Sequence, residues 1–229
     1  ARAELSVGNY DFVQGKTSIS GPITDTLAIR LSTSATTRHG TIYDVAGNTD
    51  LHRQRNIGFR GQVLYKPTDT LSLTLAGDLN VQNPLCCAQI YARVGTTQRA
   101  ANRQYPALAA AFGYAPPSTN PFDRVTDLDA KINSRQEVGG ASLVTNWDLG
   151  PATLTSVSAW RYWDWKPAND RDFIGLPITT VSQNPSQQEQ ESQEIRLASN
   201  GTNKLDYTVG AFLFHQTINT QGSQVQGSA

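Results

Sequence analysis

A nearly unbroken alternation of apolar and polar residues runs from Thr70 to Gln82 and constrains the fold more than any other feature of the sequence. Leucine or valine occupies positions 71, 73, 75, 79 and 81, whereas polar residues occupy positions 70, 72, 74, 78, 80 and 82. Successive side chains of a β-strand point to opposite faces, so this segment predicts a strand with one apolar and one polar face. The alternation alone is compatible with leucines facing a soluble core or facing the lipid around a transmembrane barrel.

The same alternation recurs along most of the chain and predicts nine strands. Their approximate ranges are 2–7, 13–20, 26–36, 56–66, 70–82, 135–148, 152–163, 193–199 and 204–216. In 135–148 and 152–163 the pattern does not sort cleanly between the two parities, so it does not assign the faces of these two strands. The sequence therefore predicts an all-β chain of two-faced strands.

Short and long connections alternate between these strands. Turns rich in Gly, Pro, Asn and Asp occupy 21–25, 67–69, 148–151 and 200–203, and a brief turn near 9–12 is the exception to the rhythm. The long connections span about 39–54, 83–133 and 164–190, and Pro106 followed by ALAAAFGY predicts a short helix within the second. In an antiparallel up-and-down meander the short turns share one rim and the long loops share the other. This sorting is typical of outer-membrane barrels.

Composition excludes several classes of protein. Nineteen basic and nineteen acidic residues cancel, so the chain has no net field for nucleic acid or an anionic surface. The mean hydropathy is −0.41, and no apolar run is long enough for a transmembrane helix. A barrel is compatible with this hydropathy because half of each strand is polar. The chain has no Met and no signal peptide, so we expect a mature product or part of a longer protein.

Charged residues within the clearly predicted strands all fall on the polar face. They are Glu4, Lys16, Arg30, Arg60, Asp78, Glu194, Arg196 and Asp206. A soluble core would impose the same sorting, so the charges support the strands rather than the membrane. Aromatic residues cluster near predicted strand ends, namely Tyr65, Trp147, Trp160, Trp163 and Tyr207. This predicts the aromatic girdles of a membrane barrel, although β-propensity also accounts for aromatic residues in strands.

Three segments together resemble TonB-dependent outer-membrane receptors. They are GNYDFVQGKTSISGPITDTLAIRLS (8–32), GFRGQVLYKPTDTLSLTLAGD (58–78) and SQEIRLASNGTNKLDYTVGAFLFHQ (192–216), and the resemblance covers nearly the whole chain. It implies an antiparallel up-and-down transmembrane β-barrel of the plugged type with about 22 strands. The present chain would hold about nine of these strands, with the plug domain and the C-terminal strands absent.

The resemblance also implies a function. Members of this family lie in the outer membrane of Gram-negative bacteria and take up a scarce extracellular ligand, so we expect an active-transport receptor, most simply for an iron–siderophore complex. The expected partners are outer-membrane lipid, and TonB with ExbB and ExbD acting through the plug domain, without nucleic acid or a cofactor. The eight polar-face charges would then line the lumen and contact the plug, or form a hydrated lumen wall.

Candidate ligand contacts lie in the long loops. They are Tyr91, Arg93, Arg99, Arg103 and Tyr105 in the second loop, and Trp165 and Arg171 in the third. Cationic and aromatic side chains could hold an anionic iron chelate, although each of these residues also fits ordinary loop packing. The histidines at 39, 52 and 215 are scattered without partners at motif spacing, so we expect neither an enzyme nor a metal site.

Cys86 and Cys87 are adjacent, in a stretch that is predicted to be a loop. No further residues complete the spacing of a metal site. A disulfide between the two, bonds to cysteines outside the segment, and free thiols all remain open.

Two other functions are compatible with the sequence. A passive porin-like channel would share the girdles and the loop sorting but would lack a plug, so an upstream plug domain with a TonB box would exclude it. A soluble carbohydrate-binding β protein would use the loop aromatics as sugar platforms and would stay monodisperse without detergent.

Overall fold

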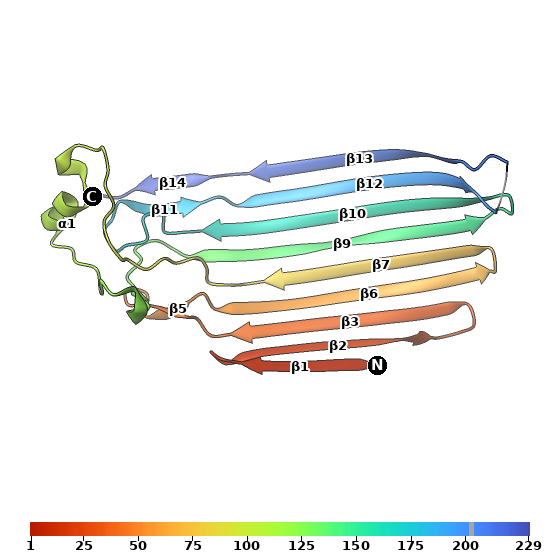
Figure 1. The fold of residues 1–229 in the computed structure, drawn as a ribbon, viewed down its shortest axis with the longest axis horizontal. Helices are drawn as coiled ribbons and strands as arrows, with labels where there is room; N and C mark the ends of the chain where they lie inside the picture. Colours follow the sequence, from red (N-terminus) through yellow and green to blue (C-terminus); the bar gives the residue numbers. More distant parts are fainter. Residues whose placement is uncertain (202–203) are drawn as a thin grey trace.

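The computed structural model describes residues 1–201 and 204–229 and contains one large antiparallel sheet. Its nine long strands follow one another in chain order, each paired with the next (Figure 1). They are β1 (Arg2–Gly8), β2 (Phe12–Pro22), β3 (Leu27–Arg38), β6 (Gln54–Thr68), β7 (Leu71–Gln82), β9 (Asn133–Asp148), β10 (Ala152–Ala168), β12 (Ser186–Ser199) and β13 (Thr208–Thr220). The predicted up-and-down sheet of about nine strands is confirmed. Within the described residues the sheet is not closed, and β1 and β13 form its edges.

The connections are sorted between the two ends of the sheet as predicted. Figure 1 shows the short turns β2–β3, β6–β7 and β9–β10 at one end and the long loops at the other. The predicted turn at 200–203 falls partly outside the described residues. The third long loop is shorter than predicted, because β10 extends to Ala168 and β12 begins at Ser186. The first residues of β12, Ser186 to Gln190, are polar on both faces, so they show no alternation that would predict a strand.

The long loops fold together at one end of the sheet. They contain β4 (Ile42–Asp44), β5 (Thr49–Leu51), β8 (Val125–Thr126), β11 (Thr179–Gln183) and α1 (Tyr105–Phe112), with 3₁₀ turns at Ala101–Arg103 and Pro121–Asp123. After β13, the short strand β14 (Ser223–Gln226) pairs with β11. A small core formed by Ile42, Leu51, Ala88 and Leu128 joins the first two loops, and Phe173 from the third packs against it. The predicted short helix is confirmed, with Pro106 in its first turn and Gly113 in the left-handed conformation at its end.

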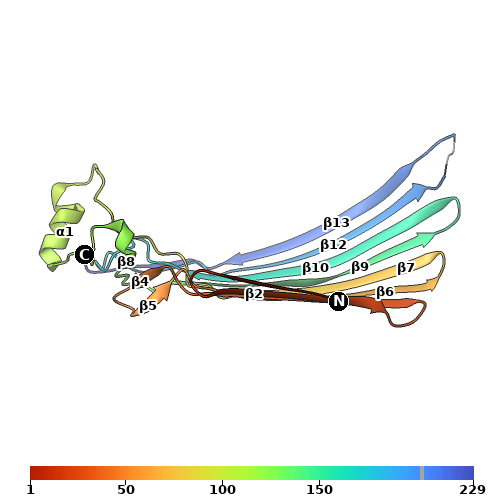
Figure 2. The ribbon, with the colours of Figure 1, turned by 60° about the horizontal axis from the view of Figure 1, so that its bottom comes forward.

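The long sheet is a single layer. Figure 2 shows it as one curved surface, with the helix and short strands confined to the loop end. The apolar side chains of its strands lie open: Leu31, Phe59 and Leu75 are 51%, 50% and 52% exposed. Most fully buried apolar residues among those described belong to the loops instead. Among the described residues, neither a second sheet nor a helix covers the leucines of β7, so the sheet lacks the second packed layer of a β-sandwich.

None of the described helices is long and apolar enough to cross a bilayer.

Candidate functional site

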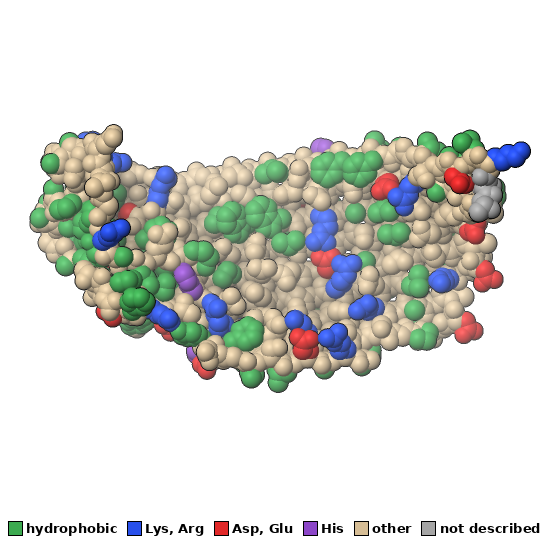
Figure 3. Space-filling view, viewed as in Figure 1, with side chains coloured by type: hydrophobic (Ala, Val, Ile, Leu, Met, Phe, Trp, Pro, Cys, Tyr) green, Lys and Arg blue, Asp and Glu red, His purple; other side chains and the backbone are tan. Residues whose placement is uncertain are grey.

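Charged residues of several strands form ion pairs on one face of the sheet. Arg60 on β6 lies directly opposite Asp78 on β7, with 3.1 Å between Nη1 and Oδ1. Lys16 and Glu4 are likewise opposed on β2 and β1, 3.4 Å apart, and Glu194 pairs with Arg196 on β12. Figure 3 shows these charges across the middle of this face, which we call the charged face.

Arg161, which the sequence pattern did not single out, completes the charged face. Its guanidinium Nη1 lies 2.6 Å from Asp78 Oδ1, although β9 separates their strands. Gly140 on β9 stands between the two residues in the register, and a Cβ there would lie 2.8 Å from the Arg161 side chain. The missing side chain at Gly140 therefore opens the path by which Arg161 reaches Asp78. The uncertain face of β10 hid this residue from sequence reasoning.

The charged face is hollowed. A surface cavity of about 610 Å³ is lined by charged residues of β1, β2, β3, β6 and β7, namely Arg2, Glu4, Lys16, Arg30, Arg60 and Asp78. Four cations and two carboxylates give this hollow a positive balance, so it attracts anions. Asp206 lies outside it, just before β13, where it accepts a hydrogen bond from Ser199.

The opposite face carries a band of apolar side chains, and the position of this band along the strands shifts from one strand to the next. At the turn end, one row in direct register is apolar throughout: Leu71, Trp147, Leu154, Leu197 and Val209. Near the loop end, another row is apolar or glycine from β1 to β7 and polar from β9 to β13, in the order Leu5, Gly15, Ala35, Ile57, Val81, Glu137, Asp164, Gln187 and Asn219. The apolar band therefore slants toward the turn end across the sheet.

The five predicted girdle aromatics do not share one face. Trp147, Trp160 and Tyr65 lie on the apolar face, in register with Leu71, Ala141 and Leu73. Trp163 lies on the charged face, so its assignment to a lipid-facing girdle was wrong. Strand parity explains the error, because residues 160 and 163 of one strand must face opposite ways. The indole of Trp163 donates to Gln136 and stacks on Trp165, with ring centroids 5.5 Å apart.

The predicted ligand contacts are divided between two places. In the second loop, Tyr91 stacks on Tyr105 with ring centroids 5.6 Å apart, and burial raises the pKa of Tyr105 to about 12. Trp165 lies in β10, not in a loop as predicted, and its indole N–H donates to Ser134. The four arginines are exposed; their positions are 93, 99, 103 and 171. The last of these donates to Gln224.

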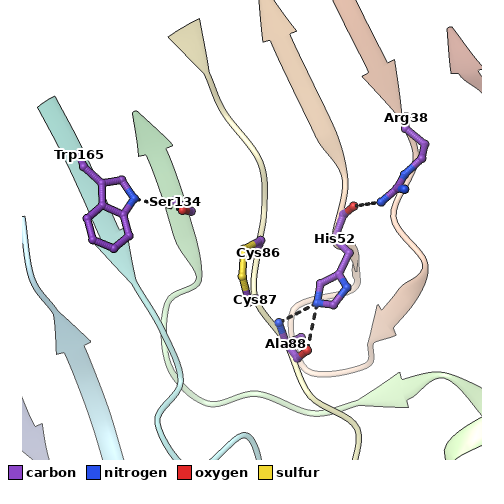
Figure 4. The surroundings of a disulfide bond; sticks show 7 residues. All are labelled: Arg38, His52, Cys86, Cys87, Ala88, Ser134 and Trp165. Carbon is purple, nitrogen blue, oxygen red and sulfur yellow. Dashed lines mark hydrogen bonds between the residues drawn. A yellow bond between two sulfur atoms is a disulfide. The ribbon is translucent and has the colours of Figure 1, made fainter. Parts of the chain in front are cut away.

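The two cysteines are bonded to each other on the segment that follows β7 (Figure 4). Next to them, Nε2 of His52 accepts a hydrogen bond from the Ala88 amide at 2.9 Å, and Arg38 donates to the His52 carbonyl. These contacts tie the first long loop to the second. His39 pairs with Asp11 instead, so the two histidines of the first loop serve separate structural contacts.

An acidic cluster in the loops was missed by sequence reasoning. Carboxylate oxygens of Asp129, Asp170 and Asp172 lie within 4.8 Å of one another, although more than forty positions separate the first from the others. Asp170 is fully buried and accepts hydrogen bonds from four backbone amides, at positions 129, 130, 172 and 173. Oxygen-only groups of this kind are the ligands that hard cations such as Ca²⁺ prefer.

Burial dominates the electrostatics of this cluster. It raises the pKa of Asp129 to about 6 and that of Asp172 to about 7, and the charge of Asp170 adds to both shifts. Burial likewise raises the pKa values of Asp44 and Asp127, which lie close enough to feel the same charge. Burial in the folded loops therefore disfavours the ionised form of these carboxyl groups.

Three solved structures resemble the whole fold. The ferric yersiniabactin uptake receptor FyuA from Yersinia pestis matches 98% of this chain with 16% identity and a TM-score of 0.73, over 32% of its own chain. FpvAI in complex with pyocin S2 matches 96% with 11% identity and a TM-score of 0.66, over 27% of its chain. FpvA from P. aeruginosa, bound to an iron complex of a heterologous pyoverdine, matches 98% with 10% identity and a TM-score of 0.64, over 28% of its chain.

The chain spans about a third of the length of these structures, and at such identities the likeness concerns the fold alone. No family model matches the sequence. No curated protein matches it either. The fold is that of a segment of a receptor β-barrel, with an up-and-down sheet that is open in the described residues.

Proposed function

We propose that this chain forms part of the barrel wall of an outer-membrane receptor that takes up a scarce extracellular ligand, an iron–siderophore complex, in a Gram-negative bacterium. TonB, with ExbB and ExbD, drives the uptake through a plug domain. The single observation that carries this proposal is the one-layer sheet, which has ion pairs along the middle of one face and a slanted apolar band on the other.

The slant supports a lipid environment for the apolar face. Strands of transmembrane barrels are tilted by roughly 35–45° from the barrel axis. A row of residues paired across such strands therefore changes its depth from strand to strand and leaves the hydrocarbon region at one end. The row from Leu5 to Asn219 becomes polar between Val81 and Glu137, as expected for a row that leaves the hydrocarbon region there. A soluble sheet would bury its apolar face without such a slant.

The charged face then lines the lumen. Its ion pairs, in rows that run from strand to strand, would contact the plug domain or hydrate the lumen wall. Its positive balance suits an anionic ferric chelate, which would be drawn toward the hollow beside Arg60. Transport of this kind needs no catalytic group in the chain.

The folded loops would lie outside the cell and make the first contacts with the ligand. We propose as contact residues Tyr91, Arg93, Arg99, Arg103, Tyr105 and Arg171 of the loops, together with Trp165 at the loop end of β10. The exposed arginines provide cations for an iron chelate, and the stacked tyrosines provide an aromatic surface.

Uptake of radioactive iron from a panel of ferric siderophores tests the proposal. Host cells with the receptor gene deleted should lose uptake of one siderophore, and cells lacking TonB should lose it equally. Uptake that persists without TonB would favour a passive porin. A receptor that fractionates with soluble proteins would contradict the membrane assignment.

A further inference from the structure

Trp165 differs from the other proposed contact residues because it lines an uncharged cavity at the loop end of the charged face. This cavity has a volume of about 240 Å³ and is lined by residues of β9, β10 and β11 and by the Cys86–Cys87 disulfide. None of the described residues that line it carries a formal charge. It therefore offers nothing specific to an anionic chelate or to a metal ion.

The cavity combines apolar walls with neutral polar groups. Trp165 and the disulfide provide the apolar walls, and Ser134 lies between them in the view of Figure 4. Amide or hydroxyl groups are carried by six of the lining residues: Asn133, Ser134, Asn169, Ser182, Gln183 and Asn184. A hydrocarbon ligand would leave these groups without hydrogen-bond partners, which costs free energy.

The Trp165 ring is held in place by two contacts. Its N–H donates to Ser134 at 3.2 Å, and Trp163 stacks against it with an interplanar angle of 19°. Trp163 does not line the cavity, whereas Trp165 does. An indole held in this way is an apolar platform for a flat ligand ring.

Asn169 adds a polar group with unused capacity. Its carboxamide oxygen is shielded from solvent and has no hydrogen-bond partner in the described chain. A small rotation of the amide would let this oxygen accept a bond from a hydroxyl in the cavity, which would remove the penalty of an unpaired buried acceptor.

We propose that this cavity is a binding site for a neutral sugar ring. A pyranose has a C–H face that packs on an indole and hydroxyl groups around its edge that exchange hydrogen bonds with amides. The volume is below the ~300–1,000 Å³ of pockets for drug-sized ligands, so the site holds a single ring rather than a whole ferric chelate. The site is separate from the charged hollow and does not depend on the nature of the transported cargo.

Titration of the full-length receptor in detergent tests this site. The probes are the neutral trisaccharides maltotriose, cellotriose, xylotriose and mannotriose, with trigalacturonate as the charged comparison, and binding is followed by calorimetry and by saturation-transfer NMR. At least one neutral trisaccharide should bind, and the charged one should bind more weakly. Absence of binding by all four at millimolar concentration, or preferred binding of trigalacturonate, would overturn the proposal.

Variants locate the binding. Trp165→Ala should weaken it about tenfold, the loss expected for a stacked aromatic contact. Gln183→Ala, at an exposed position where folding is not at risk, should weaken it about 3- to 10-fold. Trp160→Ala, on the same strand but the opposite face, should leave the affinity unchanged. Equal affinities of the Trp165, Gln183 and Trp160 variants would place the sugar elsewhere. Iron uptake is measured separately, so its failure leaves this result intact.

Discussion

Asp78 and Arg161 are 83 positions apart, and their side chains meet across an intervening strand. The two atoms lie 2.6 Å apart, while Arg60 approaches the same carboxylate oxygen from the other side at 3.1 Å. The row that contains them continues through polar residues or glycine from Arg2 on β1 to Gln216 on β13. One carboxylate thus joins three strands of the barrel wall through two guanidinium groups.

Gly140→Ala should destabilise the sheet. A Cβ at this position would lie 2.3 Å from the Trp160 carbonyl oxygen and 2.8 Å from the Arg161 side chain, so backbone and ion pair must both shift. Overpacking of this kind costs about 1–3 kcal/mol. Urea unfolding of the full-length protein in lipid vesicles measures this loss of stability. Gly15→Ala is the control, because a Cβ there meets nothing within 4 Å; equal losses in the two variants would contradict the role given to Gly140.

Asp78→Asn should lower the free energy of unfolding by about 1 kcal/mol, because two guanidinium groups would then face each other without a carboxylate between them. A double-mutant cycle isolates this effect. Arg161→Gln should cost less in the Asp78→Asn background than in the parent protein. Glu4→Gln, whose ion pairs are longer and more exposed, should change stability less. Additive effects of the Asp78 and Arg161 substitutions would mean that the ion pair contributes nothing.

The sequence predicts the long strands well wherever one face is apolar. In β3, β6 and β7, one whole face of each strand meets a single apolar environment, so every second residue is constrained to be apolar. The alternation fails at the loop ends of β10 and β12. There Gln187, Glu189 and Glu191 of β12 share the face that is apolar nearer the turn end of the sheet. In the proposed membrane orientation, strand tilt accounts for this, since the depth of a residue in the bilayer depends on both its strand and its position along that strand.

The loops resist prediction for a different reason. Asp129 and Asp170 come together because two loops pack on a small core, and no local pattern at either position records that contact. For Trp163, the sequence predicted a position near a strand end but not the face of the sheet. The face depends on the register of β10, which the pattern left open.

Leu75→Arg should impair assembly of the full-length barrel, whereas Asn80→Arg should be tolerated. Leu75 lies on the apolar face between Val63 and Leu143, where a cation near the bilayer midplane costs roughly 2–4 kcal/mol. Asn80 lines the charged hollow, where a longer cation stays hydrated. Heat-modifiable mobility of outer-membrane fractions measures the folded share. Equal assembly of the two variants would contradict the lipid-facing assignment of the apolar face.

The stability of the folded long loops should fall as the pH rises from about 4 to about 7. Asp129 and Asp172 have folded pKa values of about 6 and about 7, above the value of 3.8 for the free side chain, so the folded loops bind more protons than the unfolded loops in this window. The favourable effect is complete below the unfolded pKa and is lost as the pH passes the folded values. The cause is burial first and repulsion from Asp170 second.

Hydrogen exchange measures this loss directly. The amides of Asp129, Ala130 and Phe173, which donate to Asp170, should be better protected at pH 5 than at pH 8 after correction for intrinsic exchange. A variant with both Asp129→Asn and Asp172→Asn should show a smaller pH dependence, because an amide keeps an acceptor for the Thr179 N–H without the charge. The raised pKa values of Asp44 and Asp127 account for the remaining dependence. Protection that increases with pH in the parent protein would mean that these carboxyl groups are stabilised in their ionised form, against the burial seen here.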